Sequence, residues 1–131
     1  IFDGYFDTGN YPDEWYGRTG MSLPNITKEI CNGWKCDKTI AKVVLSSQLH
    51  AITSQLYGWN SSRIAQDDVI SKPFSGGSPV QFHRDGSYIS DQFIPIHNNS
   101  ITVWLPLDNV SLNSGTIEYI SQSHKWNNVI Q

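Results

Sequence analysis

The hydrophobic pattern of the chain changes its period at Gly58, and this change most limits the folds that the chain can adopt. Before Gly58, the segment Ser47 to Tyr57 places Leu49, Ile52 and Leu56 at helical spacing. After Gly58, short apolar runs alternate with turn-forming residues, as they do in consecutive strands. Helices that are followed by several short strands predict an α+β fold.

Three helices are predicted in the first half of the chain, and we expect residues 1–58 to form its helical part. The clearest helix spans Ser47 to Tyr57, where Ser46 or Ser47 can cap the start and Gly58 supplies the stop. A shorter helix is predicted at residues 11–16, because Pro12 suits a first helical turn. Another is predicted within residues 24–30, where Asn25 or Thr27 can cap the start and Gly33 ends the helix.

Four strands are predicted after Gly58, at residues 63–70, 80–83, 100–107 and 116–121. Consecutive short strands favour a mainly β core built as an antiparallel sandwich or jelly roll. A full jelly roll has about eight strands, so the β core over residues 59–131 would be incomplete in this chain. At 131 residues the chain is expected to form a single domain, residues 1–131.

Composition and charge exclude several classes of partner. The net charge is -3 and the basic residues form no cluster, which argues against nucleic acid. No apolar run approaches the roughly 20 residues that a membrane-spanning helix needs. The two cysteines, Cys31 and Cys36, are expected to be reduced thiols, because structural zinc normally needs four ligands. No signal peptide is recognised, so the cytoplasm is the favoured compartment, but the compartment and the oligomeric state are both left open.

A His-x-Asp pair, His83 and Asp85, is the strongest candidate for a functional site. Side chains at i and i+2 of an extended backbone point to the same face, so the imidazole and the carboxylate can converge on one metal ion. Such a pair is two thirds of the facial triad that holds non-haem Fe(II). A solvated turn or a hydrogen-bonded pair is the commoner origin of this pattern. The pair lies between apolar Phe82 and Gly86, where a strand leaves a sheet and ligand sites are frequent.

Three motifs around this pair resemble those of the phytanoyl-CoA dioxygenase family of Fe(II)/2-oxoglutarate-dependent oxygenases. Phe82–Ile89 (FHRDGSYI) resembles the metal motif of the family, and Ser100–Asp108 (SITVWLPLD) resembles the strand and turn after it. Asn113–Trp126 is similar to the family's Gly-Ser-His signature, and Phe2–Asp7 resembles the start of many members. The motifs occur in order across essentially the whole chain. The resemblance implies a double-stranded β-helix, which is a cupin-like jelly roll, preceded by N-terminal helices.

The resemblance also implies a reaction. His83 and Asp85 are then two ligands of Fe(II), with 2-oxoglutarate as cosubstrate and O2 as oxidant. The expected reaction is the hydroxylation of a small organic or lipid-like substrate, with decarboxylation of 2-oxoglutarate to succinate. The carboxylate of Asp85 favours hydroxylation over halogenation, because halogenating relatives replace this residue.

Four further residues are candidates for binding 2-oxoglutarate: Gln66, Lys72, Thr102 and Trp104. The Gln66 amide could donate a hydrogen bond to a cosubstrate carboxylate, and Lys72 offers a cation nearby. Trp104 matches a position beside the pocket in relatives, and Thr102 shares its face of the strand. Structural alternatives stay open, namely a surface amide for Gln66, a solvated strand end for Lys72 and a core tryptophan for Trp104.

The remaining histidines are interpreted as structural or as part of a substrate entrance. His124 lies in a turn that precedes the family's distal ligand, so we interpret it as structural and keep a ligand role as the alternative. His50 is expected to be a surface or cap histidine. Arg84 should point away from the metal, opposite to its two neighbours. The entrance is expected to be lined by Ile89, Phe93, Ile96 and His97.

The distal histidine of the family and its 2-oxoglutarate-binding arginine follow the element around His124. No arginine of this chain fits that position, so we expect both groups beyond Gln131 in a longer protein. Two alternatives to an oxygenase remain. One is a cupin-like module that binds a metal or ligand without catalysis, and the other is a plain β-sandwich interaction domain.

Overall fold

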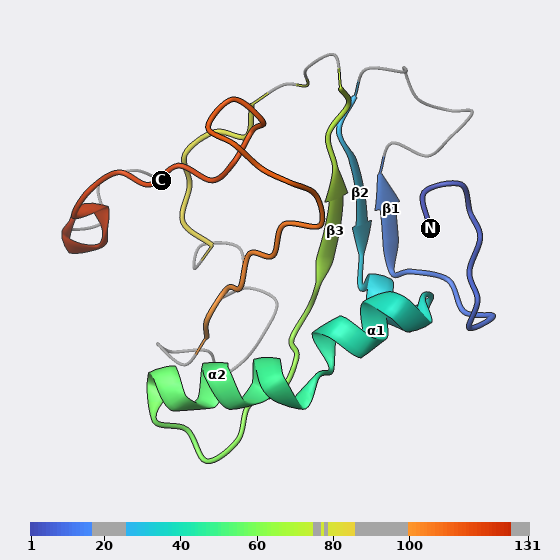
Figure 1. The fold of residues 1–131 in the computed structure, drawn as a ribbon, viewed down its shortest axis with the longest axis horizontal. Coiled ribbons are helices and arrows are strands. Elements are labelled where there is room, and N and C mark those ends of the chain that lie inside the picture. The colour runs from blue at the N-terminus through green and yellow to red at the C-terminus, as the bar shows by residue number, and fades with distance from the viewer. Residues whose placement is uncertain (17–25, 75–76, 78, 86–99, 127–131) are drawn as a thin grey trace. The chain divides into compact units, whose positions relative to one another are not determined.

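The computed structural model of the chain describes residues 1–16, 26–74, 77, 79–85 and 100–126. The chain divides into two compact units, Ile1–Ile101 and Thr102–Gln131. The described elements are, in chain order, β1 (Glu14–Tyr16), β2 (Lys28–Cys31), the 3-10 helix η1 (Gly33–Lys35), α1 (Lys38–Val44), α2 (Ser47–Tyr57), β3 (Asp68–Ser71) and the 3-10 helix η2 (Ser123–Lys125). Figure 1 shows these elements along the chain.

The first unit is organised by a three-stranded antiparallel sheet in the order β1-β2-β3 (Figure 1). The register pairs Trp15 with Ile30 and Ile30 with Val69. Because cross-strand partners share a face of a sheet, these three side chains form one apolar row. Ile30 is fully buried and Val69 is 9% exposed, so this face holds the core of the unit.

The apolar face is covered by the N-terminal segment and by η1. Phe6 packs edge-on against Trp15, with 5.5 Å between ring centroids. Gly33 of η1 approaches Val69 so closely that a Cβ atom at position 33 would lie 2.9 Å from Val69 Cγ2. Since real Cβ contacts are longer than this, the packing of η1 on the sheet requires glycine at position 33.

Helix α1 was not predicted from the sequence, although a local signal for it exists. The Asp37 side chain caps the helix, because its Oδ1 accepts hydrogen bonds from the N–H groups of Thr39 and Ile40 at 2.8 and 2.9 Å. Asp7 Oδ1 accepts a further bond from the N–H of Lys38 at 2.9 Å. Two carboxylates thus accept hydrogen bonds from the free N–H groups in the first turn of α1, and the Asp7 carboxylate also links the helix to the N-terminal segment.

The prediction of a helix at Ser47 to Tyr57 is confirmed with both of its boundaries. Ser46 Oγ accepts a hydrogen bond from the N–H of Leu49 at 3.3 Å. Gly58 adopts a left-handed conformation (φ 67°), and Trp59 N–H donates to Ser54 O across it. The buried residues of α2 are Thr53 and Ser54, while Ile52 and Leu56, on the predicted apolar stripe, are substantially exposed.

The helices predicted at residues 11–16 and 24–30 are wrong where the structure describes them, because β1 and β2 lie there. Proline and Asn or Thr favour a helix start only through local contacts. Strand pairing is the stronger influence here, because Trp15, Tyr16 and Ile30 are residue types that favour strands. Next to the paired residues, the Asp13 N–H also donates to Cys31 O. Tertiary contacts therefore override the local cap signals.

The strand predicted at residues 63–70 is confirmed only at its end, as β3. The predicted strands at residues 80–83, 100–107 and 116–121 form no β-ladder with the described residues. Their apolar side chains, such as Leu105 and Leu107, are largely exposed, so they lack the neighbours that a strand needs. The described fold is α+β with an antiparallel sheet, and the jelly roll and the single domain over residues 1–131 stay predictions.

Candidate functional site

The candidate site is carried by residues 79–85, a segment without helix or strand that follows β3 in the first unit. His83 Nε2 lies 3.3 Å from Asp85 Oδ1, so the two side chains converge as their i, i+2 spacing predicts. Both side chains remain open to solvent, with relative exposures of 41% and 46%. An incoming ion can therefore reach both donor atoms.

The main chain fixes the orientation of the imidazole. His83 Nδ1 lies 2.7 Å from the carbonyl oxygen of Gln81. A carbonyl only accepts hydrogen bonds, so this contact selects the tautomer in which Nδ1 carries the proton. In the neutral imidazole Nε2 is then the nitrogen that can bind a metal ion, and it lies beside Asp85 Oδ1. Metal-bound histidines usually donate their other N–H in this way.

The donor atoms fit an octahedral metal ion. Two ligands in cis positions at about 2.1 Å from a metal lie about 3 Å apart. The 3.3 Å between His83 Nε2 and Asp85 Oδ1 is close to this separation. One imidazole nitrogen and one carboxylate oxygen are also the ligand types of the Fe(II) facial triad. The described residues thus place two possible donor atoms at a separation that suits Fe(II).

The four residues predicted to bind 2-oxoglutarate are divided between the two units of the chain. Gln66 Nε2 donates to both carboxylate oxygens of Asp68, at 2.9 and 3.0 Å. Lys72 follows β3 directly and is exposed. Thr102 and Trp104 belong to the second unit and are exposed there. Their roles toward 2-oxoglutarate stay predictions.

The other histidines differ in what the structure says of them. His124 lies in η2 of the second unit and is exposed. His50 Nδ1 lies 2.8 Å from Ser62 Oγ, which also contacts Thr53 Oγ1 at 3.0 Å, so this histidine ties the loop after α2 to the helix. The predicted entrance residues, Ile89, Phe93, Ile96 and His97, lie outside the described residues.

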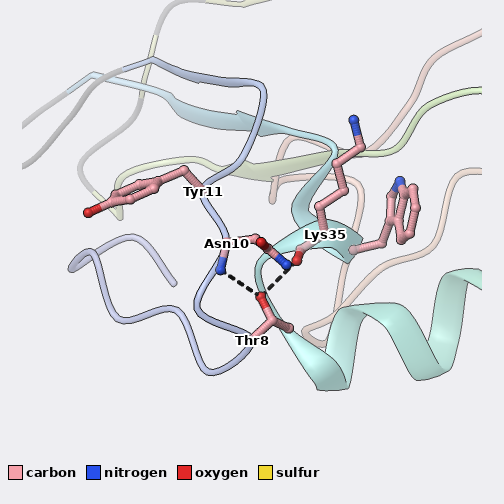
Figure 2. Close-up of a pocket in the computed structure, with 5 residues that line it drawn as sticks. Thr8, Asn10, Tyr11 and Lys35 are labelled. Atoms are coloured by element: carbon pink, nitrogen blue, oxygen red, sulfur yellow. Dashed lines mark hydrogen bonds between the residues drawn. The ribbon is translucent and has the colours of Figure 1, made fainter.

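An open hollow of about 480 Å³ lies elsewhere in the first unit, and is lined by Thr8, Asn10, Tyr11, Trp34 and Lys35. Figure 2 shows the Thr8 hydroxyl donating to the Lys35 carbonyl at 2.7 Å and accepting from the Asn10 N–H at 3.2 Å. The Lys35 ammonium pairs with Asp13 at 2.6 Å, and this hydrogen bond lowers the pKa of the Asp13 carboxyl. These contacts join the N-terminal segment to η1, so we assign the hollow a structural role.

Sequence reasoning missed one cluster of possible metal ligands. Glu29, Cys31 and Asp68 place their carboxylate oxygens and thiol sulfur within 4.8 Å of one another on the sheet. No sequence motif joins the three residues, because Asp68 meets the other two only through the pairing of β2 with β3. The signal that could have found them is strand register, which local patterns do not encode.

No helix among the described residues is both long and apolar enough to cross a membrane.

Comparisons with known proteins place the chain in a family. The searches of curated proteins and of solved structures find no significant match. The family model of phytanoyl-CoA dioxygenase (PhyH) matches residues 26–130, which is most of the chain and includes His83 and Asp85. The chain therefore belongs to the phytanoyl-CoA dioxygenase family.

Proposed function

We propose that this protein is an Fe(II)- and 2-oxoglutarate-dependent dioxygenase that hydroxylates a small organic or lipid-like substrate. Members of the family are in general non-haem iron oxygenases that use 2-oxoglutarate. The observation that carries the proposal is the convergence of His83 Nε2 and Asp85 Oδ1 at 3.3 Å. When bound there, iron would supply the activation of O2.

The residues of the chain contribute binding and orientation to this chemistry. Asp85 brings a negative charge that favours a divalent cation, and the Gln81 carbonyl holds the proton on Nδ1 of His83 so that Nε2 can bind. A carboxylate at position 85 would take a coordination position on the iron, which supports hydroxylation rather than halogenation. We assign Lys72, Thr102 and Trp104 to 2-oxoglutarate as part of the same proposal, and Gln66 would join them only by giving up its hydrogen bonds to Asp68.

The proposal is tested by anaerobic Fe(II) titration and by succinate formation from 2-oxoglutarate in the full protein chain. We expect His83→Ala and Asp85→Ala each to weaken Fe(II) binding by roughly 100-fold or more and to abolish succinate formation, because each removes a ligand. The control is His50→Gln, which replaces a histidine bonded to Ser62 in the loop after α2. It should bind Fe(II) and form succinate as the unchanged chain does.

Two outcomes of this experiment would change the assignment. Unchanged Fe(II) binding and turnover in both His83→Ala and Asp85→Ala would overturn it. Fe(II) binding that depends on His83 and Asp85 without any succinate formation would favour the alternative function, a cupin-like metal-binding module. That alternative is supported by the fact that only two ligands converge here within the described part of the chain.

A further inference from the structure

The polar face of the sheet carries a second set of possible metal ligands. Glu29 and Cys31 alternate along β2 and share this face, and Cys31 pairs directly with Asp68 of β3. Their oxygen and sulfur atoms all lie within 4.8 Å of one another. This set shares no residue with the pair at His83 and Asp85.

Cys31 distinguishes this set from an ordinary acidic surface. Two carboxylates on a sheet are commonly solvated and indicate nothing by themselves. The Cys31 side chain, however, is only 8% exposed, and it lies on the central strand between Glu14 of β1 and Asp68 of β3. The fold thus brings a buried thiol that is not in a disulfide together with two carboxyl groups, and the three can act as metal donors.

The two carboxyl groups of this set form no ion pair with a lysine or arginine in the described part of the chain. Burial raises the pKa of Glu29, and the neighbouring Asp68 and Glu14 raise it further. Burial also raises the pKa of the Cys31 thiol to about 12, helped by the hydrogen bond to Asp68. A divalent cation would replace this repulsion by attraction.

Asp68 is already held in place by a neighbouring side chain. Gln66 Nε2 donates to both of its carboxylate oxygens, at 2.9 and 3.0 Å. Metal-bound carboxylates are usually oriented by such hydrogen bonds. Each oxygen keeps a further lone pair for a metal, so the bonds from Gln66 orient the ligand without blocking it.

We propose that Glu29, Cys31 and Asp68 bind a borderline divalent cation, for which Zn²⁺ is the best match. One thiolate and two carboxylates are ligands that zinc accepts, with water in the remaining position. Tetrahedral zinc with Zn–S of about 2.3 Å and Zn–O of about 2.1 Å holds its donor atoms roughly 3.5 Å apart. The donor atoms now lie within 4.8 Å of one another. Rotation of the Glu29 and Asp68 side chains would bring them to the shorter separation that zinc requires. Binding breaks the S–H bond of Cys31, forms a sulfur–zinc bond and releases one proton to solvent.

The test uses Co²⁺ as a spectroscopic substitute for Zn²⁺ in the reduced chain. A thiolate bound to Co²⁺ gives a charge-transfer absorption in the near ultraviolet, whereas a histidine–carboxylate site does not. We therefore expect this band in the unchanged chain and in the His83→Ala/Asp85→Ala double variant. We expect Zn²⁺ to displace the Co²⁺ and remove the band. The affinity should rise with pH, by up to about tenfold per pH unit, because one proton is released.

Cys31→Ser should abolish the band, and Asp68→Asn should weaken Co²⁺ binding by at least about tenfold. Cys36→Ser is the matched control, because Cys36 is the other buried cysteine of the chain and lies outside the ligand set. It should keep the band. Asp68 is exposed, so Asp68→Asn keeps the test valid even if Cys31→Ser does not fold. Absence of the band in the unchanged chain, or a band that survives Cys31→Ser and is lost in Cys36→Ser, would overturn the proposal.

Discussion

The two candidate sites of the first unit are built by different means. The pair at His83 and Asp85 is made within one short segment of the chain, where residues two apart bring their donor atoms to 3.3 Å. The set at Glu29, Cys31 and Asp68 exists only because β2 pairs with β3 in one register. A local site survives changes in the rest of the fold, whereas a register-built site depends on the whole sheet.

The largest effect that separates the two sites is expected from Ile30→Ala. Ile30 is fully buried at the centre of the apolar row, so its truncation should lower the free energy of unfolding by about 2–4 kcal/mol. Urea denaturation measures this. The same variant should weaken Co²⁺–thiolate binding at the sheet while Fe(II) binding at His83 and Asp85 persists.

Ile70→Ala is the matched control for this prediction. Ile70 lies on the other face of the sheet and is 52% exposed, so its truncation should cost less than about 1 kcal/mol. Equal losses from Ile30→Ala and Ile70→Ala would contradict the assignment of the core to the row at Trp15, Ile30 and Val69.

A smaller effect is expected from Gly33→Ala, which presses η1 away from the sheet. The new Cβ would lie 2.9 Å from Val69 Cγ2, so we expect a loss of about 1–3 kcal/mol in the free energy of unfolding. A double-mutant cycle with Val69→Ala locates the cause. If the clash is responsible, Val69→Ala should cost less in the Gly33→Ala background than in the unchanged chain, and additive costs would exclude it.

The effect that is smallest at neutral pH, and that grows only at alkaline pH, concerns the thiol of the register-built set. Burial and the neighbouring carboxylates raise the pKa of Cys31 from an ordinary value of 9.0 to about 12. The unfolded chain therefore releases this proton first, and the free energy of unfolding should fall as the pH rises from 9.0 toward about 12. The hydrogen bond to Glu14 raises the pKa of Tyr16 to about 12 as well, so it contributes in the same direction.

Urea denaturation across this pH range separates the two groups. Cys31→Ala should flatten the pH dependence at its lower end, where the unfolded thiol ionises, and Tyr16→Phe should flatten it at its upper end. A slope that stays the same in Cys31→Ala would show that the thiol is not perturbed by the sheet.

What the sequence predicts well is what short-range contacts decide. The boundaries of α2 follow from Ser46 and Gly58, and the convergence of His83 with Asp85 follows from the i, i+2 spacing. Both depend on neighbours along the chain. The prediction of α2 as a helix is therefore confirmed, although the residues that it buries differ from the predicted stripe.

What the sequence predicts poorly is what pairing partners decide. Local helix-start signals lie just ahead of residues 14–16 and 28–31. These residues nevertheless form β1 and β2, because each segment pairs with a neighbouring strand in the sheet. The ligand set at Cys31 is invisible for the same reason. The predicted strands after residue 79 show that an apolar pattern is not enough for a strand. They form no β-ladder in the described residues.

The bond from His83 to the carbonyl of Gln81 has a consequence for variation in the sequence. Because the acceptor is a main-chain atom, the choice of imidazole tautomer does not depend on which side chain stands at position 81. That side chain can change, or acquire contacts with a substrate, without changing which imidazole nitrogen is held by the main chain. The main chain thus sets the orientation of the His83 ring. We therefore expect the residue type at position 81 to vary among related sequences.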